Sequence, residues 1–143
     1  MKTILVSGAS GIVGYGILKS LRMSDEKYNL IGTSIYDDTI AEAFCDLFIK
    51  TIPSTYDNYI QWLLDIIVEK KVDLIIPGIE IDMKLWNLHR GLIEKMGVKV
   101  LLNDSNLIDL CSDKWVFYKY MRENNISYSI KSSLDTNYSL LKE

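Results

Sequence analysis

The chain of 143 residues has little of what marks metal-binding or disulfide-linked proteins. Its two cysteines, Cys45 and Cys111, are far apart and match no metal-ligand spacing. We therefore expect no metal site, and two reduced, buried thiols in a cytoplasmic protein. The single histidine, His89, is expected on the polar side of a helix, without a chemical role.

Long apolar runs and clusters of basic residues are also missing. No apolar stretch approaches the roughly 20 residues that a membrane helix needs, and the N-terminus has no signal-peptide pattern. The net charge of −3 and the absence of a Lys/Arg run argue against a nucleic-acid-binding surface. We therefore expect neither a membrane nor a nucleic acid among the partners of this chain.

Apolar strands and amphipathic helices alternate along the sequence. Strands are expected at 3–7, 29–34, 47–51, 72–78 and 98–103, and helices at 12–22, 39–44, 57–70 and 83–96. This alternation predicts an α/β fold, a Rossmann-like parallel sheet of about five strands with helices on both faces. We expect the sheet to end near Leu102. Two short helices should follow, capped by Asp104 or Ser105 and by Ser112 or Asp113, and then a strand at 127–133.

Two helices have apolar positions that indicate which face is buried. In the helix at 57–70 these are Ile60, Leu63, Leu64 and Ile67. In the helix at 83–96 they are Leu85, Leu88, Leu92 and Met96, and Gly97 is expected to end that helix.

A glycine loop, Gly8-x-x-Gly11-x-x-Gly14, follows the first strand and opens the first helix. A helix N-terminus offers free N–H groups and a favourable dipole to an anion, so this context suits a ligand site. The spacing differs from the dinucleotide pattern G-x-G-x-x-G and is closer to that of short-chain dehydrogenases. The alternative is that Gly14 and Gly16 only let the helix pack closely on the strand.

A dehydrogenase-like, NAD(P)-binding domain is therefore one hypothesis. Asp37 and Asp38 follow the second strand, where an acid would hold ribose hydroxyls, but "IYDDT" also suits a turn or a helix cap. Tyr15 and Lys19 have the Tyr-x-x-x-Lys spacing of the catalytic pair, yet they fall in the first helix, which is the wrong element.

The second half of the chain carries a more specific pattern. It consists of "VDLIIPGIEID", an amphipathic helix, "GVKVLLN" and "SDKWVFYKYMRENNI". In this order, and together with the glycine loop, these segments resemble the N-terminal, pre-ATP-grasp domain of ATP-grasp ligases. Carbamoyl-phosphate synthase large chains, biotin carboxylases and formate-dependent glycinamide ribonucleotide transformylases share that domain. Asn125 stands where the family usually has Gly, and Asn also tolerates the left-handed conformation.

The resemblance implies an ATP-dependent carboxylate–amine ligase, similar to carbamoyl-phosphate synthase. Gly8, Ser10 and Gly11 would face a small carboxylate or amine substrate, Glu80 would contact an amine or hydroxyl of it, and Lys114 would touch ATP. ATP and Mg²⁺ would be bound by the full-length protein. From the residues alone, Glu80 and Asp82 could instead cap a helix, and Lys114 could be an ordinary solvated residue.

The same resemblance implies a division of the chain. Residues 1–125 would form the pre-ATP-grasp domain, and residues 126–143 would begin a truncated ATP-grasp domain. The residues that perform phosphoryl transfer in the family come later, so the chain alone is expected to be inactive and to bind no cofactor. A stand-alone small-molecule-binding module is the remaining alternative, and a homodimer is left open by the aromatic residues.

Overall fold

A computed structural model of the chain describes residues 1–37 and 39–135. It contains two compact units, Met1–Leu102 and a second that begins at Asn103. The first unit ends where the sheet was expected to end. The expected domain of residues 1–125 therefore extends over both units.

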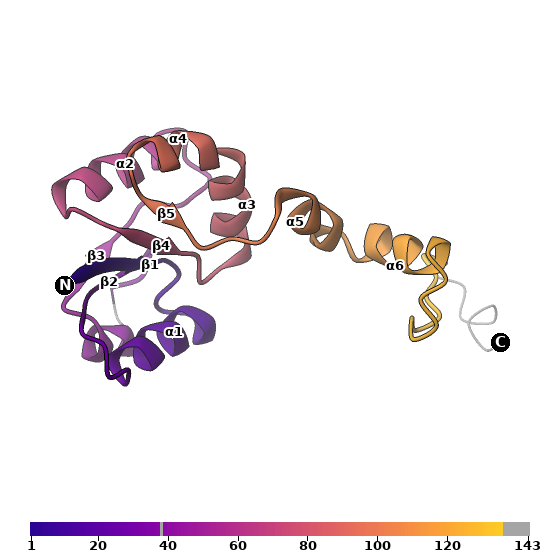
Figure 1. Ribbon diagram of the computed structural model, residues 1–143, viewed down its shortest axis with the longest axis horizontal. Coiled ribbons are helices and arrows are strands. Elements are labelled where there is room, and N and C mark those ends of the chain that lie inside the picture. The colour runs from indigo at the N-terminus through magenta and orange to yellow at the C-terminus, as the bar shows by residue number, and fades with distance from the viewer. Residues whose placement is uncertain (38, 136–143) are drawn as a thin grey trace. The chain divides into compact units, whose positions relative to one another are not determined.

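The first unit is built on a five-stranded parallel sheet (Figure 1). Its strands lie in the order β3-β2-β1-β4-β5, and every neighbouring pair is parallel. Their bounds are β1 Lys2–Val6, β2 Tyr28–Ser34, β3 Leu47–Lys50, β4 Leu74–Ile76 and β5 Lys99–Val100. The α/β fold with a Rossmann-like parallel sheet is thus confirmed.

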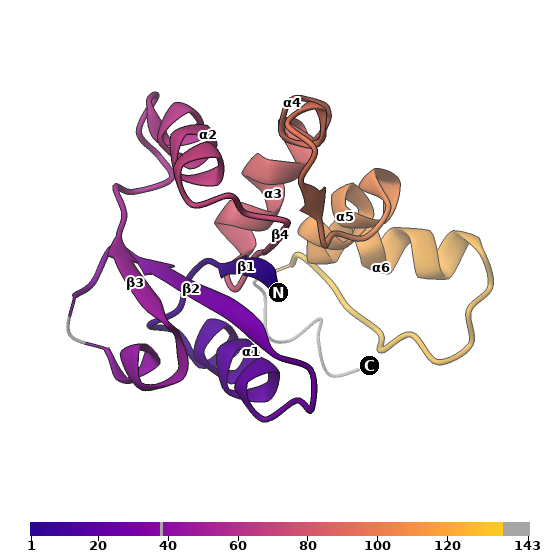
Figure 2. The same ribbon diagram turned by 60° about the vertical axis from the view of Figure 1, so that its left-hand side comes forward.

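Helices cover both faces of this sheet, as Figures 1 and 2 show. One face carries α1 (Ile12–Arg22) and the 3-10 helix η1 (Ile40–Phe44), and the other carries α2 (Tyr59–Glu69), α3 (Glu80–Leu88) and α4 (Arg90–Lys95). Alternate residues of each strand enter the two cores. Ile4 and Val6 of β1 pack with Leu18 of α1, whereas Leu5 packs with Leu63 of α2.

The helix expected at 83–96 is in fact two helices that meet at His89. The expected buried face is wrong except for Leu85, which packs against the core, because Leu88 is 77% exposed while Trp86 and Ile93 are fully buried. The true inner face is rotated by about one residue and contains Asp82, which is only 3% exposed. The sequence pattern followed the aliphatic residues, but the large indole contributes more apolar area to a core than a leucine does.

Two glycines hold α1 against the ends of β1 and β4. A β-carbon at Gly14 would lie 2.6 Å from the carbonyl carbon of Gly8, and one at Gly78 would lie 2.7 Å from the α-carbon of Gly14. Both approaches are too close for any side chain. Around a β-carbon at Gly16 there would be open space, so a packing role applies to Gly14 and not to Gly16.

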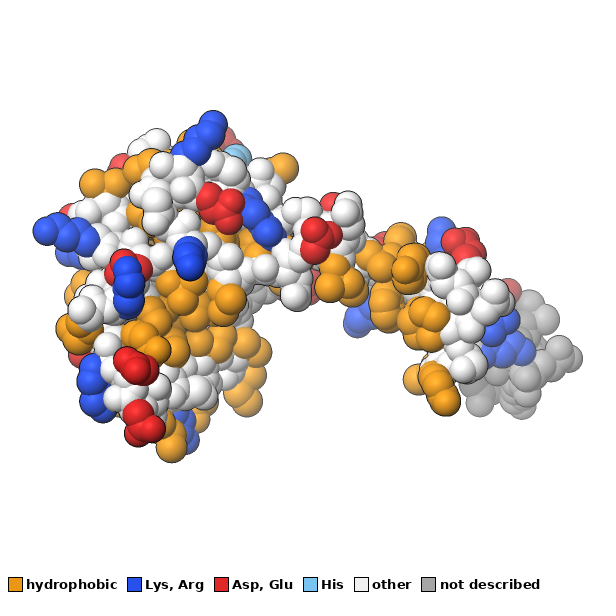
Figure 3. Space-filling view, in the orientation of Figure 1, with side chains coloured by type: hydrophobic (Ala, Val, Ile, Leu, Met, Phe, Trp, Pro, Cys, Tyr) orange, Lys and Arg blue, Asp and Glu red, His pale blue; other side chains and the backbone are white. Residues whose placement is uncertain are grey.

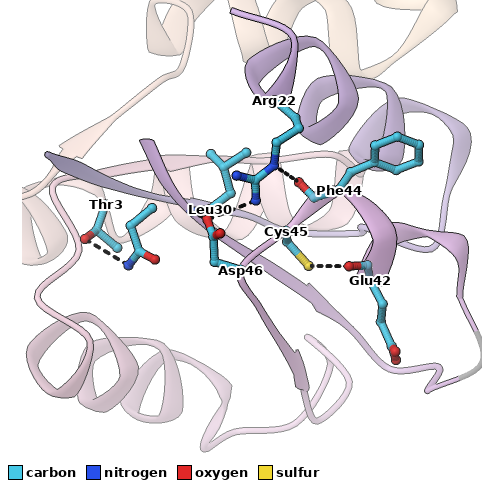
Figure 4. A network of polar contacts seen from close by, with 8 residues as sticks. Thr3, Arg22, Leu30, Glu42, Phe44, Cys45 and Asp46 are labelled. Carbon is cyan, nitrogen blue, oxygen red and sulfur yellow. Dashed lines mark hydrogen bonds and ion pairs between the residues drawn. The ribbon is translucent and has the colours of Figure 1, made fainter. Parts of the chain in front are cut away.

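The last residue of α1 holds the connection between η1 and β3 (Figure 4). Arg22 donates through Nε to the carbonyl of Phe44 at 3.4 Å, and its terminal nitrogen lies 3.0 Å from the carboxylate of Asp46. The same carboxylate accepts the backbone N–H of Leu30 at 2.8 Å. Partial burial raises the pKa of Asp46, but the hydrogen bonds from Leu30 and Arg22 outweigh it and leave that pKa below its ordinary value.

The second unit begins with two short helices, α5 (Ser105–Ser112) and α6 (Lys114–Glu123). Asp104 caps α5, and Asp113 caps α6 by accepting the N–H groups of Trp115 and Val116. Asn125 follows α6 with a φ of 54°, the left-handed conformation expected of it. Figure 3 shows hydrophobic side chains gathered over α6 on the face in view. Val116, Phe117 and Tyr120 are the exposed large hydrophobic residues of this helix.

The strand expected at 127–133 does not form. These residues are a turn followed by irregular backbone, and no strand pairs with them within residues 1–37 and 39–135. Tyr128 and Ile130 are 92% and 84% exposed, so the alternation of apolar residues has no sheet to pack on.

Both cysteines are free, but the expectation that both are buried is wrong. Cys45 is half-buried and Cys111 is exposed. Burial raises the pKa of the Cys45 thiol, whose sulfur lies 4.0 Å from the carbonyl oxygen of Glu42 (Figure 4). Of the helices in the described residues, none combines the length and the apolar character that crossing a membrane requires.

Replacing Gly14 with alanine should destabilise the first unit, even though alanine is the better helix former. The new methyl group would collide with the backbone of Gly8, and overpacking of this kind costs about 1–3 kcal/mol. Gly16→Ala is the matched control in the same helix, and it should stabilise the unit by about 0.5–1 kcal/mol. Urea unfolding measures both, and equal effects of the two substitutions would contradict the packing role of Gly14.

Acidification should remove a part of the stability that depends on Asp46. Because its pKa is lower in the folded chain, its contribution is fully present above pH ~5 and is lost as the pH falls through the folded pKa. Asp46→Asn should therefore lose less unfolding free energy than the wild type between pH 7 and pH 3. Urea unfolding at the two pH values measures this difference, and an identical loss in both proteins would show that Asp46 contributes nothing.

Candidate functional site

A cavity of about 400 Å³ opens at the carboxyl edge of the sheet. Its walls come from the segments that follow β1, β2 and β3 and from the start of α3, which follows β4. The chain runs from β1 to β2 and β3 on one side and to β4 and β5 on the other, so β1 and β4 flank the switch point of the sheet. This edge is where ligands bind in open parallel sheets, and the volume lies in the range of small-molecule sites.

The glycine loop forms the part of the wall that follows β1. Gly8 has a φ of 59°, which favours glycine, and its carbonyl accepts the N–H of Gly11 at 2.8 Å. Gly11 is the N-cap residue of α1, where no side chain caps the helix and no acid stands in the first turn. The hydroxyl oxygen of Ser10 is buried and has no hydrogen-bond partner in the part of the chain that the structure describes. These features suit an acceptor group on a ligand.

Some residues of the glycine loop thus pack against backbone, and others line the cavity. Gly14 meets the backbone of Ser7 and Gly8, whereas Gly8, Ser10 and Gly11 line the cavity. The packing interpretation drawn from the sequence therefore holds for Gly14, and the ligand interpretation stays a prediction for Gly8 and Gly11. Gly8 also packs, because a β-carbon there would collide with the side chain of Ile79.

A buried acid forms the opposite part of the wall. Asp82 lies in the first turn of α3 and accepts a hydrogen bond from the hydroxyl of Ser54. Tyr59, at the start of α2, is 1% exposed and belongs to the same group of polar residues. Burial raises the pKa of the Tyr59 phenol, and the negative charge of Asp82 raises it further, so this phenol stays protonated.

Two polar groups buried nearby in the fold lack partners. The indole nitrogen of Trp86, one turn after Asp82, and the hydroxyl of Thr33, next to Ser34 of β2, have no hydrogen-bond partner among the described residues. Both residues are almost completely buried, at 0% and 1% exposed. Buried polar atoms are usually satisfied, so each of these two is an atom whose hydrogen bonding a buried water would complete. Neither residue lines the cavity.

Most of the remaining wall is apolar, and Ser34, Thr51 and Thr55 add hydroxyl groups to it. Ile35, Tyr36, Ile79 and Ile81 all line the cavity and are exposed to between 39% and 65%. A hollow with apolar walls and a few convergent polar groups is the usual form of a binding site for a small organic molecule.

The structure brings together some of the residues proposed from the sequence and separates others. Gly8, Ser10 and Gly11 line the cavity. Glu80 is the first residue of α3, is exposed, and pairs with Lys84 at 2.7 Å. Neither Glu80 nor Asp82 is the N-cap of α3, which is Ile79. Both acids lie in the first turn, where a negative charge favours the helix.

Lys114 belongs to the second unit. It is the first residue of α6, directly after the N-cap, and its side chain is exposed. The residues of the dehydrogenase hypothesis have other surroundings. The ring of Tyr15 packs against Phe44 with 5.6 Å between centroids, and Asp37 pairs with Lys50 at 2.6 Å. Asp38 lies outside the described residues.

Sequence reasoning did not single out Asp82, Ser54 or Tyr59 as a group. Asp82 was considered only as a helix cap and as the second acid of the family pattern, and the other two fall in a loop and at a helix start. One signal was available, because Asp82 precedes Trp86 by four residues and such residues share a helix face. Among the described residues, no three His, Cys, Asp or Glu side chains come together as metal ligands.

Comparison with known proteins gives a likeness in structure only. No protein-family model matches the chain, and no curated protein matches it. Among solved structures, the N5-carboxyaminoimidazole ribonucleotide synthetase from Thermotoga maritima is 20% identical, with a TM-score of 0.57 over 87% of this chain and 31% of its own. The chain spans less than a third of that enzyme, so the similarity concerns one part of it.

Two biotin carboxylases are similar over the same share of this chain. The biotin carboxylase domain of the Hydrogenobacter thermophilus 2-oxoglutarate carboxylase is 20% identical, with a TM-score of 0.61 over 87% of this chain and 27% of that one. The biotin carboxylase subunit of a pyruvate carboxylase is 18% identical, with a TM-score of 0.61 over 87% of this chain and 28% of that one. Since biotin carboxylases are among the ATP-grasp ligases that the sequence resembles, the chain has the fold of part of such a ligase.

Proposed function

We propose that the chain is the N-terminal domain of an ATP-dependent ligase that joins a carboxylate to an amine. It would belong to the ATP-grasp branch of carbamoyl-phosphate synthase large chains and biotin carboxylases. The observation that carries this proposal is the cavity at the carboxyl edge of the sheet, with Gly8, Ser10 and Gly11 in its wall, in a fold shared with biotin carboxylase domains.

In this function the domain binds and orients the substrate. The glycine loop offers backbone N–H groups and the hydroxyl of Ser10 to an acceptor group, and Glu80 contacts a part of the substrate that projects from the cavity. Lys114 provides a positive charge for the phosphates of ATP. The described residues do not form a carboxylate site for Mg²⁺, so we assign no step in this chain to the metal.

The binding partners and the cellular location of such a domain follow from the same proposal. Its partners are a small-molecule carboxylate or amine and ATP, and a homodimer is compatible with the exposed aromatic residues Tyr36 and Tyr120. A cytoplasmic location fits the two free cysteines.

Turnover by the protein that carries this chain tests the proposal. ADP release should require a carboxylate and an amine together, with Mg²⁺ present. Titration with NADH, followed by fluorescence, tests the dehydrogenase alternative in the same preparation. ADP release that never depends on an amine, or NADH binding at micromolar concentration, would overturn the ligase function.

Replacing Lys114 with alanine should weaken ATP binding in that protein about tenfold, because a charge-assisted hydrogen bond contributes about 1.5–3 kcal/mol. Lys119→Ala is the control, since it removes the same charge from the same exposed helix. Isothermal titration with ATP measures both variants. Equal affinities of Lys114→Ala and the wild type would show that Lys114 is an ordinary solvated residue.

Replacing Glu80 with glutamine should raise the KM for the amine substrate and leave the KM for ATP unchanged. The substitution keeps the shape of the side chain and removes the charge that would hold an amine or hydroxyl. Steady-state kinetics with each substrate varied in turn separates the two effects. An equal rise in both KM values would mean that the charge serves only the N-terminus of α3.

A further inference from the structure

The charge inside the cavity is unbalanced. Asp82 is the one acidic residue among the described residues that line it, and no lysine, arginine or histidine lines it in that part of the chain. Charged residues close in sequence to the lining segments pair with each other, as Lys84 does with Glu80 and Lys50 with Asp37. The other described lining residues are apolar or carry hydroxyl groups or no side chain.

A carboxylate that is 97% buried is expensive to keep in this surrounding. Asp82 is 3% exposed, and it forms no ion pair within residues 1–37 and 39–135. The hydroxyl groups of Ser54 and Tyr59 donate to it, but both donors are neutral and neither balances its charge. Buried charges in proteins are normally balanced by an opposite charge, and the described residues supply no such counter-charge to Asp82.

The position of Asp82 is fixed independently of any ligand. α3 begins at Glu80 because β4 ends in the tight contact between Gly78 and Gly14, and Asp82 then faces inward one turn before the buried Trp86. Ser54 and Tyr59 enclose the carboxylate from the segment that follows β3. The group is therefore a rigid, preorganised negative charge at the wall of an apolar hollow.

We propose that Asp82 binds the ammonium group of the amine substrate, and that the apolar wall formed by Ile35, Tyr36, Ile79 and Ile81 holds the hydrocarbon body attached to that nitrogen. The substrate class is then a primary amine with an apolar body that fits a cavity of about 400 Å³. That this amine is a substrate rests on the proposed ligase function, whereas the preference of the cavity for a cation does not.

Three probes with one hydrocarbon body and different charges test this preference. They are benzylammonium, benzyl alcohol and benzoate, titrated into the isotopically labelled full chain and followed by the amide signals of Ser54, Gly11 and Asp82. Benzylammonium should bind at least about tenfold more tightly than benzyl alcohol, and benzoate should bind most weakly. Absent binding of benzylammonium, or equal or tighter binding of either other probe, would overturn the proposal.

A pair of variants assigns the preference to one carboxylate. Asp82→Asn should reduce the affinity for benzylammonium to that for benzyl alcohol, and Asp82→Glu should retain a preference for the cation. Asp65→Asn is the matched control, because Asp65 is an exposed acid of α2 that does not line the cavity. A preference that survives in Asp82→Asn would assign the cation to another group and refute the role of Asp82.

The comparison within the wild type needs no variant, so the proposal can be refuted even if Asp82→Asn fails to fold. The experiment also uses no ATP. If the wild type shows no preference for the cation but still releases ADP in an amine-dependent way, only the role of Asp82 is refuted. A clear cation preference in a protein without such ADP release would instead refute the ligase function.

Discussion

The contact on which the rest of the first unit depends is the approach of three stretches of backbone around Gly14. The helix α1, the turn after β1 and the turn after β4 meet there at distances that exclude any side chain. Because Gly14 rests on the carbonyl of Gly8, α1 must begin at the end of β1, and the turn between them bends sharply at Gly8. Because Gly78 rests on Gly14, the chain after β4 leaves the sheet in one direction only.

These constraints determine what lines the cavity. The sharp turn after β1 places Ser10 and Gly11 at one part of the wall, and the departure after Gly78 places Ile79, Ile81 and Asp82 at another. A parallel sheet brings all such turns to the same edge, and the change of direction at β1 leaves room between them. The site therefore results from backbone packing, while its chemical character depends on the few side chains that project from the turns.

The sequence was sufficient to predict the parallel sheet, but it was insufficient to predict much of what surrounds the sheet. Buried parallel strands are continuous apolar runs, and "VDLIIPG" could hardly be anything else. The left-handed residues Gly97 and Asn125 were also predictable from residue type, whereas Lys71, with a φ of 52°, was not, because nothing in a lysine indicates that conformation. The face of α3 was misjudged because the pattern followed the aliphatic residues and left out Trp86. The burial of Asp82 was not predictable, because it depends on Ser54 and Tyr59, which are far away in the sequence.

The sequence indicated one part of the cavity wall and not the opposite part. A glycine loop is visible in a sequence because its residues are consecutive, and Gly8, Ser10 and Gly11 do line the cavity. The opposite wall combines α3 with the segment after β3, and the pairing of such distant segments becomes visible only once the strand order is known.

The strand order has a further consequence for how copies of this chain can associate. The sheet ends on one side in β5, which has two residues, and on the other in β3, which has four residues and ends at Lys50, three residues before Pro53. Short edges with a charge or a proline offer few unpaired backbone groups for another strand to join. Association of two copies would therefore have to proceed through side chains, and fibril-like growth from the sheet edge is disfavoured by the fold itself.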